Sequence, residues 1–274
     1  MTIPTQTPAT RPGPRLLTVR RSQHITPHMQ RVTLGGEALA GFPTGREGAN
    51  IKIFLPQPGQ AAPTLPSFGQ GGITWPADAP RAIVRTYTLR SYRADAGEID
   101  IDFVLHDHAG PASAWAASAK PGDTLGVGGP GAGGPVLPPA EWHLLVGDLS
   151  ALPAIGALLE NMPATARGHA LVELASPEDR QQLAVPPGVT LAWLDQPTPG
   201  QPSPLVAAVR ALAWPTAAQT FTWLAGENSA VIQIRDELRQ AHGLDRSQLR
   251  AVPYWKRGTA EEAYHDERHT VMDG

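Results

Sequence analysis

The period of the hydrophobic pattern changes partway along the chain, and this change constrains the fold more than any other feature. From Arg15 to about Val136, apolar and polar residues alternate in short runs separated by glycine and proline, as in EIDIDFVLH. Such alternation is typical of antiparallel sheets and barrels. After about Ala140 the runs are continuously apolar, as in HLLVGD and FTWLAGE, and they alternate with helical stretches. That second pattern indicates a parallel sheet.

The change of pattern predicts a domain boundary between Pro135 and Ala140. We therefore expect a tail at residues 1–14, a β-barrel domain at 15–137, and an α/β domain with a C-terminal tail at 138–274. Within the first domain, strands are expected at 16–21, 29–34, 50–56, 84–92 and 98–106. The proline- and glycine-rich stretch 56–80 predicts an irregular loop, and GPASAWAASAKPGD at 110–123 predicts a short helix.

Composition excludes several classes of protein. With 274 residues, 41% of them hydrophobic, the chain can bury one or two cores, and no apolar run approaches the roughly 18 residues of a membrane helix. The net charge of -3 argues against a nucleic-acid partner. The chain has no cysteine, which excludes disulfides, thiolate metal sites and cysteine nucleophiles. Any redox chemistry therefore requires a bound cofactor.

The N-terminal segment carries basic residues without an acid. Arginines stand at four of the first 23 positions, as in a transit peptide, but the apolar segment of a secretory signal is missing. We interpret the segment as a tail that leads into the first strand. A cytoplasmic protein is the resulting expectation.

Residues 85–92 read RTYTLRSY and collect aromatic, hydroxyl and guanidinium groups on one predicted strand. Alternation sends Arg85 and Tyr87 to one face and Thr86 and Thr88 to the other, and we expect it to continue to the end of the run. A ring, hydroxyls and cations are what a planar, phosphate-bearing cofactor needs. An exposed edge strand with polar cross-strand pairs would look similar.

Two predicted strands end in turns that lead directly into helices. One is WHLLVGDLSALPAI at 142–155, with Asp148 and Ser150 in the turn, and the other is FTWLAGEN at 221–228. Ligands of open α/β sheets bind at the carboxyl ends of strands, so two such ends side by side predict a crevice. The alternative is an ordinary junction with a helix cap. Glu227 would contact a ribose or a nicotinamide amide, or simply cap its helix.

Three weaker motifs need separate interpretations. GVGGPG at 126–131 matches the dinucleotide pattern GxGxxG, but the prolines around it forbid the required helix, so we expect an interdomain linker. GPAS at 110–113 places a short side chain before a helix whose amides would accept a phosphate. His265 and His269 have helical spacing in a charged tail, without the HExxH pattern, and we expect no metal site.

Five segments in fixed order resemble the siderophore-interacting protein family. They are RTYTLR, FVLHDHAGPASAWA followed by PGDTL, VGDLSALPAI, WLAGE and YWKRG, and the resemblance runs from about Leu16 to about Tyr264. Members of this family are FAD-dependent ferric-siderophore reductases. The resemblance implies a six-stranded antiparallel barrel that binds FAD, followed by a nicotinamide-binding domain. It also implies electron transfer from NADPH or NADH through FAD to Fe(III) in a siderophore.

The same resemblance implies roles for individual residues. FAD contacts are implied at Arg85, Tyr87, Thr88, Leu89, His106, Gly110, Pro111, Ala112, Ser113 and Trp115. Cofactor contacts from the second domain are implied at Asp148, Ser150, Ala151, Gly226 and Glu227. Tyr87 would stack on the isoalloxazine ring and Thr88 would lie near its N5 edge, so these two are the catalytic candidates. Ser150 stands where the family usually has threonine, and its hydroxyl is retained.

A set of basic and aromatic residues would receive the ferric chelate. The resemblance implies substrate contacts at Lys52, Trp255, Lys256 and Arg257. Positive charge would steer an anionic chelate that is too large to be enclosed. The alternative is a solvated basic strand end. The loop GAGG after Gly129-Pro130 lacks the basic residue that the family often has there.

Several alternatives stay open at the level of sequence. The donor is NADH, NADPH or a reduced ferredoxin, and neither the siderophore nor the oligomeric state is indicated. A related flavin reductase with a ferredoxin or free-flavin partner would share these motifs. A non-enzymatic module that binds iron chelates is the remaining alternative.

Overall fold

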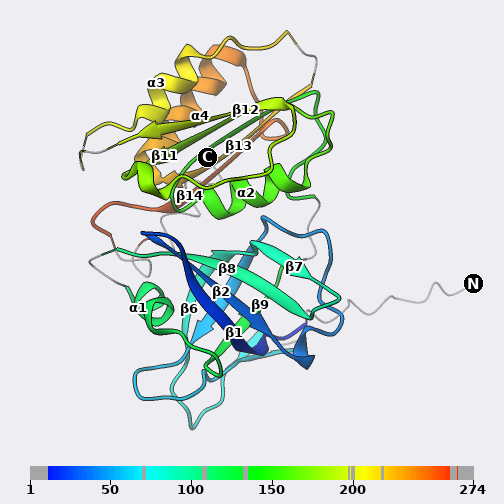
Figure 1. The fold of residues 1–274 in the computed structure, drawn as a ribbon, viewed down its shortest axis with the longest axis vertical. Helices are drawn as coiled ribbons and strands as arrows, with labels where there is room; N and C mark the ends of the chain where they lie inside the picture. Colours follow the sequence, from blue (N-terminus) through cyan, green and yellow to red (C-terminus); the bar gives the residue numbers. More distant parts are fainter. Residues whose placement is uncertain are drawn as a thin grey trace, which may run out of the picture.

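The computed structural model describes residues 12–69, 72–106, 110–131, 135–196, 198, 201–216, 219–259 and 264. It consists of an antiparallel barrel and an α/β domain, stacked along the long axis of the molecule (Figure 1). Both expected domain architectures are confirmed. No helix in these ranges is long and apolar enough to cross a membrane.

The barrel is built from one antiparallel sheet of seven strands in the order β6-β3-β9-β1-β2-β8-β7. The strands are β1 (Arg15–Thr26), β2 (Met29–Gly35), β3 (Asn50–Leu55), β6 (Ile83–Thr88), β7 (Ser91–Arg93), β8 (Glu98–Val104) and β9 (Thr124–Gly128). The three-residue β7 is the strand beyond the six expected. The expected helix is present as α1 (Pro111–Ser118), and a short 3-10 helix spans Glu37–Leu39.

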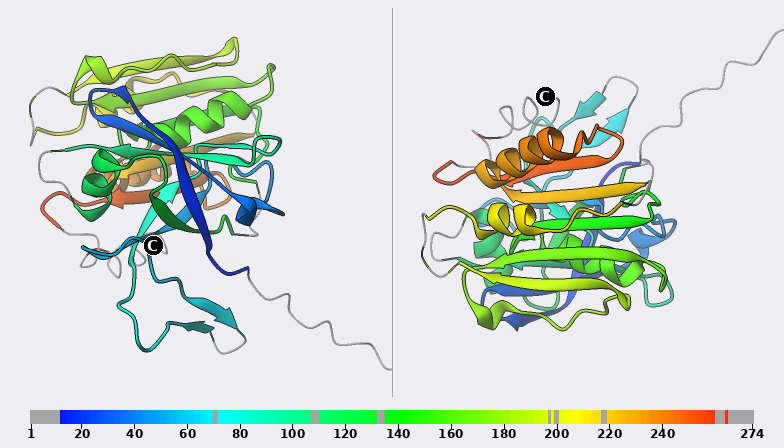
Figure 2. Two further views of the ribbon diagram at one scale, coloured as in Figure 1. Left: turned by 60° about the horizontal axis from the view of Figure 1, so that its bottom comes forward. Right: turned by 90° about the horizontal axis from the view of Figure 1, so that it is seen from above.

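The stretch 56–80, expected to be an irregular loop, contains a small hairpin. Its strands are β4 (Ser67–Gly69) and β5 (Gly72–Thr74), and it projects from the barrel (Figure 2, left). The other described residues of the stretch, 56–66 and 75–80, form turns and bends without a helix or strand.

Alternating apolar side chains of the strands fill the barrel. Phe103 on β8 is fully buried and lies between the rings of Tyr87 and Trp115, with centroid distances of 4.5 Å and 5.7 Å. Since fully burying such a side chain contributes about 1.5–3 kcal/mol, these rings are a substantial part of the core. The core therefore supports Tyr87 from inside the barrel.

The run RTYTLRSY is not one strand. β6 pairs with β3 at one edge of the sheet, whereas β7 pairs with β8 at the other edge. The chain passes from one edge of the sheet to the other at Leu89 and Arg90. Leu89 N donates to Ala49 O at 2.9 Å, and Arg90 N donates to Asp100 O at 3.0 Å. The expectation of continued alternation was wrong beyond Thr88, where the backbone changes its hydrogen-bonding partners and closes the barrel.

The segment GVGGPG is also not simply a linker. Gly126 and Gly128 belong to β9, which pairs with both β1 and β3. A Cβ atom at Gly126 would lie 2.3 Å from Leu65 Cδ2 and 2.8 Å from Phe54 Cβ. The linker expectation was therefore wrong for these residues, because both pair within the barrel sheet. Glycine is required at Gly126 by the close approach of Leu65 and Phe54.

The second domain has a five-stranded parallel sheet in the order β12-β11-β10-β13-β14. The strands are β10 (Trp142–Asp148), β11 (Arg167–Leu174), β12 (Gly188–Asp195), β13 (Thr220–Glu227) and β14 (Leu249–Trp255). Helix α2 (Leu152–Asn161) covers the face toward the barrel, and α3 (Pro204–Ala211) and α4 (Asn228–His242) cover the other face (Figures 1 and 2). Strand order reverses between β10 and β13, where such folds bind ligands.

Direct polar contacts join the two domains. Arg90, which is buried, donates to both carboxylate oxygens of Glu160 on α2, at 2.6 Å and 2.7 Å. Asp179, the last residue of a short 3-10 helix at Pro177–Asp179, accepts from the Thr26 hydroxyl at 2.8 Å and from the His28 amide at 3.0 Å. Bidentate arginine–carboxylate pairs are directional as well as strong, so they fix how the domains face each other.

Asp100 provides a test of the barrel edge that contains β7. Burial raises the pKa of Asp100, but hydrogen bonds from Arg93, Thr33 and Ser91 lower it by more than burial raises it. The result is a pKa of about 2. Because the folded pKa lies below the unfolded value of about 3.9, the stabilisation is complete above pH 4 and is lost as the pH falls toward 2.

We expect Asp100→Asn to lower the free energy of unfolding by about 2 kcal/mol at pH 7, and by much less near pH 2.5. Urea unfolding at both pH values measures the two differences. Asp95→Asn, in the exposed turn after β7, is the matched control and should change little at either pH. An equal loss for Asp100→Asn at both pH values would contradict the assignment.

Candidate functional site

A cavity of about 1670 Å³ lies between the barrel and the α/β domain. It exceeds the 300–1,000 Å³ that is usual for a single drug-sized ligand, so it has room for a larger ligand or for two ligand parts. Both domains and the end of β14 line it. The expected site residues that line it are Lys52, Tyr87, Thr88, His106, Asp148, Ser150, Gly226, Glu227, Trp255, Lys256 and Arg257.

The barrel wall of the cavity is formed by β6 and β3. The ring of Tyr87 is half-buried, and Phe103 packs against it from the core. Thr88 is 5% exposed and lines the same wall. Lys52 Nζ on β3 donates to Thr86 Oγ1 at 2.6 Å, which holds the lysine along the strand. The wall thus offers a fixed aromatic ring, hydroxyls and a cation to a planar ligand.

The other expected residues of the barrel lie outside this cavity. Leu89 is fully buried in the core, and its amide and carbonyl bond to Ala49 and Gly48, so it serves the barrel. Arg85 is half-buried and donates to Val84 O at 2.9 Å. Neither residue lines the interdomain cavity.

Helix α1 begins with backbone groups that no side chain caps. Gly110 is its N-cap residue, without a side-chain hydrogen bond, and Pro111 occupies the first turn. Ala112 and Ser113 are 6% and 5% exposed, so they would meet a ligand mainly through backbone amides. Uncapped amides at a helix N-terminus favour an anion, which fits a phosphate group. Trp115 is half-buried against Phe103 and packs in the core instead.

Asp148 organises the opposite wall. Its Oδ1 atom accepts from the Ser150 amide at 2.9 Å and from the Ser150 hydroxyl. Its Oδ2 atom accepts from Glu227 N and from Trp255 Nε1, both at 2.8 Å. Burial raises the pKa of Asp148, although these four hydrogen bonds oppose the rise. One carboxylate therefore ties together the ends of β10, β13 and β14.

Glycines beside these strand ends make room for the arrangement. Gly226 has a φ of 140°, and a Cβ atom there would lie 2.7 Å from Asp148 Oδ2. At Gly147, a Cβ atom would lie 2.4 Å from Ala151 Cβ. Ala151 is fully buried, so it packs under the turn and does not line the cavity. The glycines are thus required by the close approach of Asp148 and Ala151.

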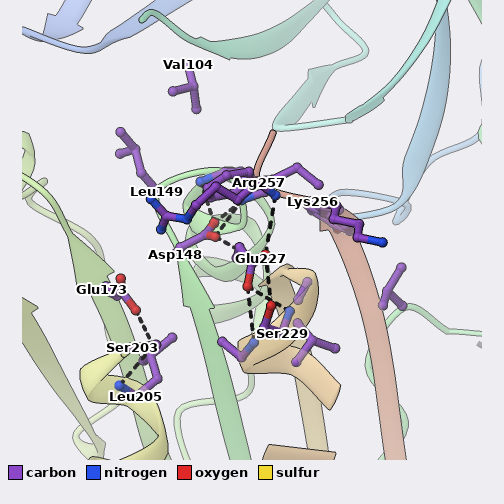
Figure 3. A pocket seen from close by; sticks show the side chains of 18 of the residues that line it. Val104, Asp148, Leu149, Glu173, Ser203, Leu205, Glu227, Ser229, Lys256 and Arg257 are labelled. Carbon is purple, nitrogen blue, oxygen red and sulfur yellow. Dashed lines mark hydrogen bonds between the residues drawn. The ribbon is translucent and has the colours of Figure 1, made fainter. Parts of the chain in front are cut away.

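Glu227 caps a helix, which was one of the two alternatives left open by its sequence. Its Oε2 atom accepts from the amides of Ser229 at 2.7 Å and Ala230 at 3.3 Å, at the start of α4. Its Oε1 atom accepts from Arg257 N at 3.4 Å. The side chain also lines the cavity, so the capping role does not remove it from the site (Figure 3).

The end of β14 forms a partly exposed aromatic and basic rim. Trp255 is 39% exposed, and the Arg257 guanidinium lies 5.8 Å from the centroid of its indole ring. Tyr254 Oη donates to Asn50 Oδ1 on the barrel at 3.4 Å. Lys256 and Arg257 both line the cavity, and Figure 3 shows Lys256 on the side of Asp148 away from Glu173.

The sequence interpretation missed Glu173. It is the next-to-last residue of β11 and lies in register with Asp148 on β10, and the Ser203 hydroxyl donates to its Oε2 atom (Figure 3). Burial raises the pKa of Glu173, and the charges of Asp148 and Glu227 add to this rise, while Ser203 and Arg257 oppose it. Its signal was a third acidic residue at the end of an apolar run, in HALVEL.

The histidine pair of the C-terminal tail cannot be placed. His265 and His269, at which no metal site was expected, lie outside the described residues. Within the described ranges, no group of three or more histidine, cysteine, aspartate or glutamate side chains is arranged to hold a metal ion.

Comparisons with known proteins cover nearly the whole chain. The family model for the siderophore-interacting FAD-binding domain matches residues 18–134, and that for siderophore-interacting protein matches residues 140–258. Ferric vibriobactin reductase ViuB of Vibrio cholerae is 42% identical over 262 residues, which are 95% of this chain and 96% of that protein. The NADPH-dependent ferric-chelate reductase of Escherichia coli is 35% identical, over 88% of this chain and 92% of that protein.

Solved structures agree with these sequence matches. The siderophore-interacting protein SipS of Aeromonas hydrophila superimposes with a TM-score of 0.84 at 44% identity, over 97% of this chain and 100% of that chain. The cytochrome b5 reductase domain of Ulva prolifera nitrate reductase has a TM-score of 0.61 at 14% identity, over 86% of this chain and 96% of that chain. The second likeness shows a shared fold.

The packing of Gly226 against Asp148 yields a testable prediction. We expect Gly226→Ala to lower the free energy of unfolding by at least about 3 kcal/mol, because the new methyl group displaces Asp148 and the backbone is strained at this φ. Gly243→Ala is the matched control, since Gly243 also has a positive φ of 66° but a Cβ atom there meets nothing within 4 Å. It should cost only about 1 kcal/mol. Equal losses in urea unfolding would show that Asp148 is not tightly held.

Proposed function

The chain belongs to the siderophore-interacting protein family, and from this premise we propose a flavin-dependent reductase that passes electrons from NADPH or NADH through FAD to Fe(III) in a ferric siderophore. The protein is an oxidoreductase, and its small-molecule substrate is the ferric chelate. We place the reaction, and the release of Fe(II), in the cytoplasm.

One observation carries this proposal. The cavity brings Tyr87 and Thr88 of the barrel opposite the strand ends of Asp148 and Glu227. A flavin held by the barrel and a nicotinamide held at the reversal of strand order would meet there. Proximity of this kind is what hydride transfer between two bound groups requires.

The barrel residues fit the chemical groups of FAD. The ring of Tyr87 would stack on the planar ring system, and the hydroxyl of Thr88 would hydrogen-bond at its edge. Arg85 and the uncapped amides at the start of α1 would bind the phosphates. When bound, FAD supplies the redox chemistry, since it can accept a hydride and give up electrons one at a time. The protein contributes orientation and phosphate binding.

The α/β domain would position the nicotinamide dinucleotide. Helix α2 begins after the Asp148 turn without a side-chain cap, so its first amides suit a pyrophosphate. Asp148 and Gly226 hold the ends of β10 and β13 at the spacing that forms the crevice. Ser150 would orient its hydroxyl through its bond to Asp148. These residues act by positioning, and no proton transfer is assigned to them.

The rim at β14 and β3 would receive the ferric siderophore. Lys52, Lys256 and Arg257 supply positive charge at the cavity, and Trp255 offers an exposed ring. Charge of this sign raises the encounter rate of an anionic chelate. Oxygen-rich chelators are hard ligands that hold Fe(II) far more weakly than Fe(III), so reduction would also release the metal.

The decisive experiment combines a spectrum with two half-reactions. Protein reconstituted with FAD should show flavin absorption bands, and anaerobic NADH or NADPH should bleach them. Ferric chelates should then reoxidise the flavin, and a colorimetric Fe(II) trap should report the product. Absence of flavin bands after reconstitution, or a rate no higher than that of free FAD, would reject the proposal. Bleaching by reduced ferredoxin, but by neither nicotinamide, would identify ferredoxin as the donor.

A first variant addresses the flavin site. We expect Arg85→Ala to raise the dissociation constant for FAD by at least about 10-fold, since a charge-assisted phosphate contact is lost. Titration of apoprotein with FAD, followed by flavin fluorescence, measures the change. Arg250→Ala, an exposed arginine on β14 that does not line this cavity, is the control and should bind FAD normally. Unchanged FAD affinity in Arg85→Ala would remove Arg85 from the site.

A second variant addresses the rim. Lys256→Ala combined with Arg257→Ala should retain FAD and raise KM for anionic ferric chelates, because steering and docking charge is lost. The difference from the unmodified protein should shrink as ionic strength rises, since salt screens exposed charges. Steady-state kinetics at low and high salt measure both effects. A double variant with unchanged KM at low salt would show that the chelate docks elsewhere.

A further inference from the structure

One end of the cavity is built around Glu173. This residue is the next-to-last of β11, the strand that follows β10 and α2, and it lies in register beside Asp148. The walls around it come from the segments that follow β11 and β12. They are Ala175, Asp179, Gln196, Gln201, Pro202 and Ser203.

The side chain of Glu173 is held in place by a helix cap. Ser203 Oγ donates to Glu173 Oε2, and the same hydroxyl accepts from Leu205 N at 3.2 Å at the start of α3 (Figure 3). Glu173 makes no other hydrogen bond to the described part of the chain, and it is half-buried at the cavity wall. A carboxylate oxygen is therefore available to a ligand in the cavity.

The position of this acid in the fold has a chemical meaning. In dinucleotide-binding α/β domains, the pyrophosphate lies at the turn after the first strand, and the adenosine ribose reaches the end of the second. An acid there accepts hydrogen bonds from the ribose hydroxyls of NAD, whereas an arginine accommodates the 2'-phosphate of NADP. Here β10 is the first strand of the unit, β11 is the second, and Glu173 is its terminal acid.

The charges at this end of the cavity favour the same ligand. Among the residues named above, Glu173 and Asp179 are acidic and none is a lysine or arginine. Two basic residues line the cavity close by, since His28 bonds to Asp179 and the charge of Arg257 acts on Glu173. Asp179 is already engaged by Thr26 and His28. The nearby Arg180 does not line the cavity and donates to both carboxylate oxygens of Asp195 at 2.9 Å. A 2'-phosphate at the end of β11 would therefore meet the Glu173 carboxylate, whereas a ribose diol would find a hydrogen-bond acceptor there.

We propose that Glu173, held by Ser203, binds the adenosine ribose of the nicotinamide dinucleotide and makes NADH the preferred donor over NADPH. The proposal rests on the proposed function, since it specifies the donor for that same site. Glu173 acts here as a specificity-determining residue, at a distance from the hydride transfer itself.

The test measures donor preference on FAD-loaded protein. Anaerobic stopped-flow flavin reduction should give at least about a 10-fold larger kcat/KM for NADH than for NADPH. Glu173→Gln should reduce this ratio to less than about 3-fold. Glu178→Gln, an exposed acid in the nearby 3-10 helix, should keep the original ratio. A preference for NADPH in the unmodified protein, or an unchanged ratio in Glu173→Gln, would overturn the proposal.

Two further measurements keep the result independent of activity and folding. Calorimetric titration with ADP and with 2',5'-ADP should give tighter binding of ADP, and Glu173→Gln should narrow the difference. Gln201→Arg places a cation at an exposed position that lines the same cavity, and it should raise affinity for 2',5'-ADP by about 10-fold, even if Glu173→Gln fails to fold. Equal binding of both nucleotides to the unmodified protein contradicts the proposal.

The proposed function fails in a different way. If neither nicotinamide bleaches the flavin, or if chemically reduced protein does not reduce ferric chelates, the reductase assignment is wrong. If both half-reactions proceed but the donor ratio does not depend on Glu173, the reductase stands and only the donor assignment is rejected.

Discussion

The geometry of the site depends on the carboxylate of Asp148. It accepts four hydrogen bonds from three elements, and so it fixes the ends of β10, β13 and β14 relative to one another. A half-buried carboxylate with this many donors is stable only if each donor stays in place. Gly226 is part of the same arrangement, because no larger residue fits beside the carboxylate. The crevice of the α/β domain is thus set by polar contacts as well as by sheet pairing.

The cavity also requires that the two domains keep a fixed relation. Arg90 on the barrel donates two hydrogen bonds to Glu160 on α2, and Asp179 accepts hydrogen bonds from Thr26 and His28 at the end of the β1–β2 hairpin. Because Arg90 is buried, removing Glu160 would leave a desolvated cation without this partner. Function at the interface therefore relies on residues that touch neither proposed cofactor. The site is formed jointly, since each domain supplies only one wall.

Sequence periodicity was sufficient to predict the two architectures and the strand ends where site residues meet. It could not predict the barrel crossing after Thr88, because the partners of Leu89 and Arg90 come from distant segments. It also misjudged Gly126, since the contact with Leu65 that requires glycine spans a long loop. Glu173 was missed because its partner Ser203 lies 30 residues further along the chain. Local signals thus predicted elements, and tertiary contacts determined the remaining details.

The crossing segment places three consecutive residues in three different surroundings. Thr88 lines the cavity, Leu89 lies in the barrel core, and Arg90 reaches Glu160 in the other domain. The wall of the cavity and the contact between the domains are therefore joined by two peptide units of one buried segment. Any displacement of Leu89 in the core would move both neighbours, so the packing of the barrel interior supports the cavity wall and the domain contact together.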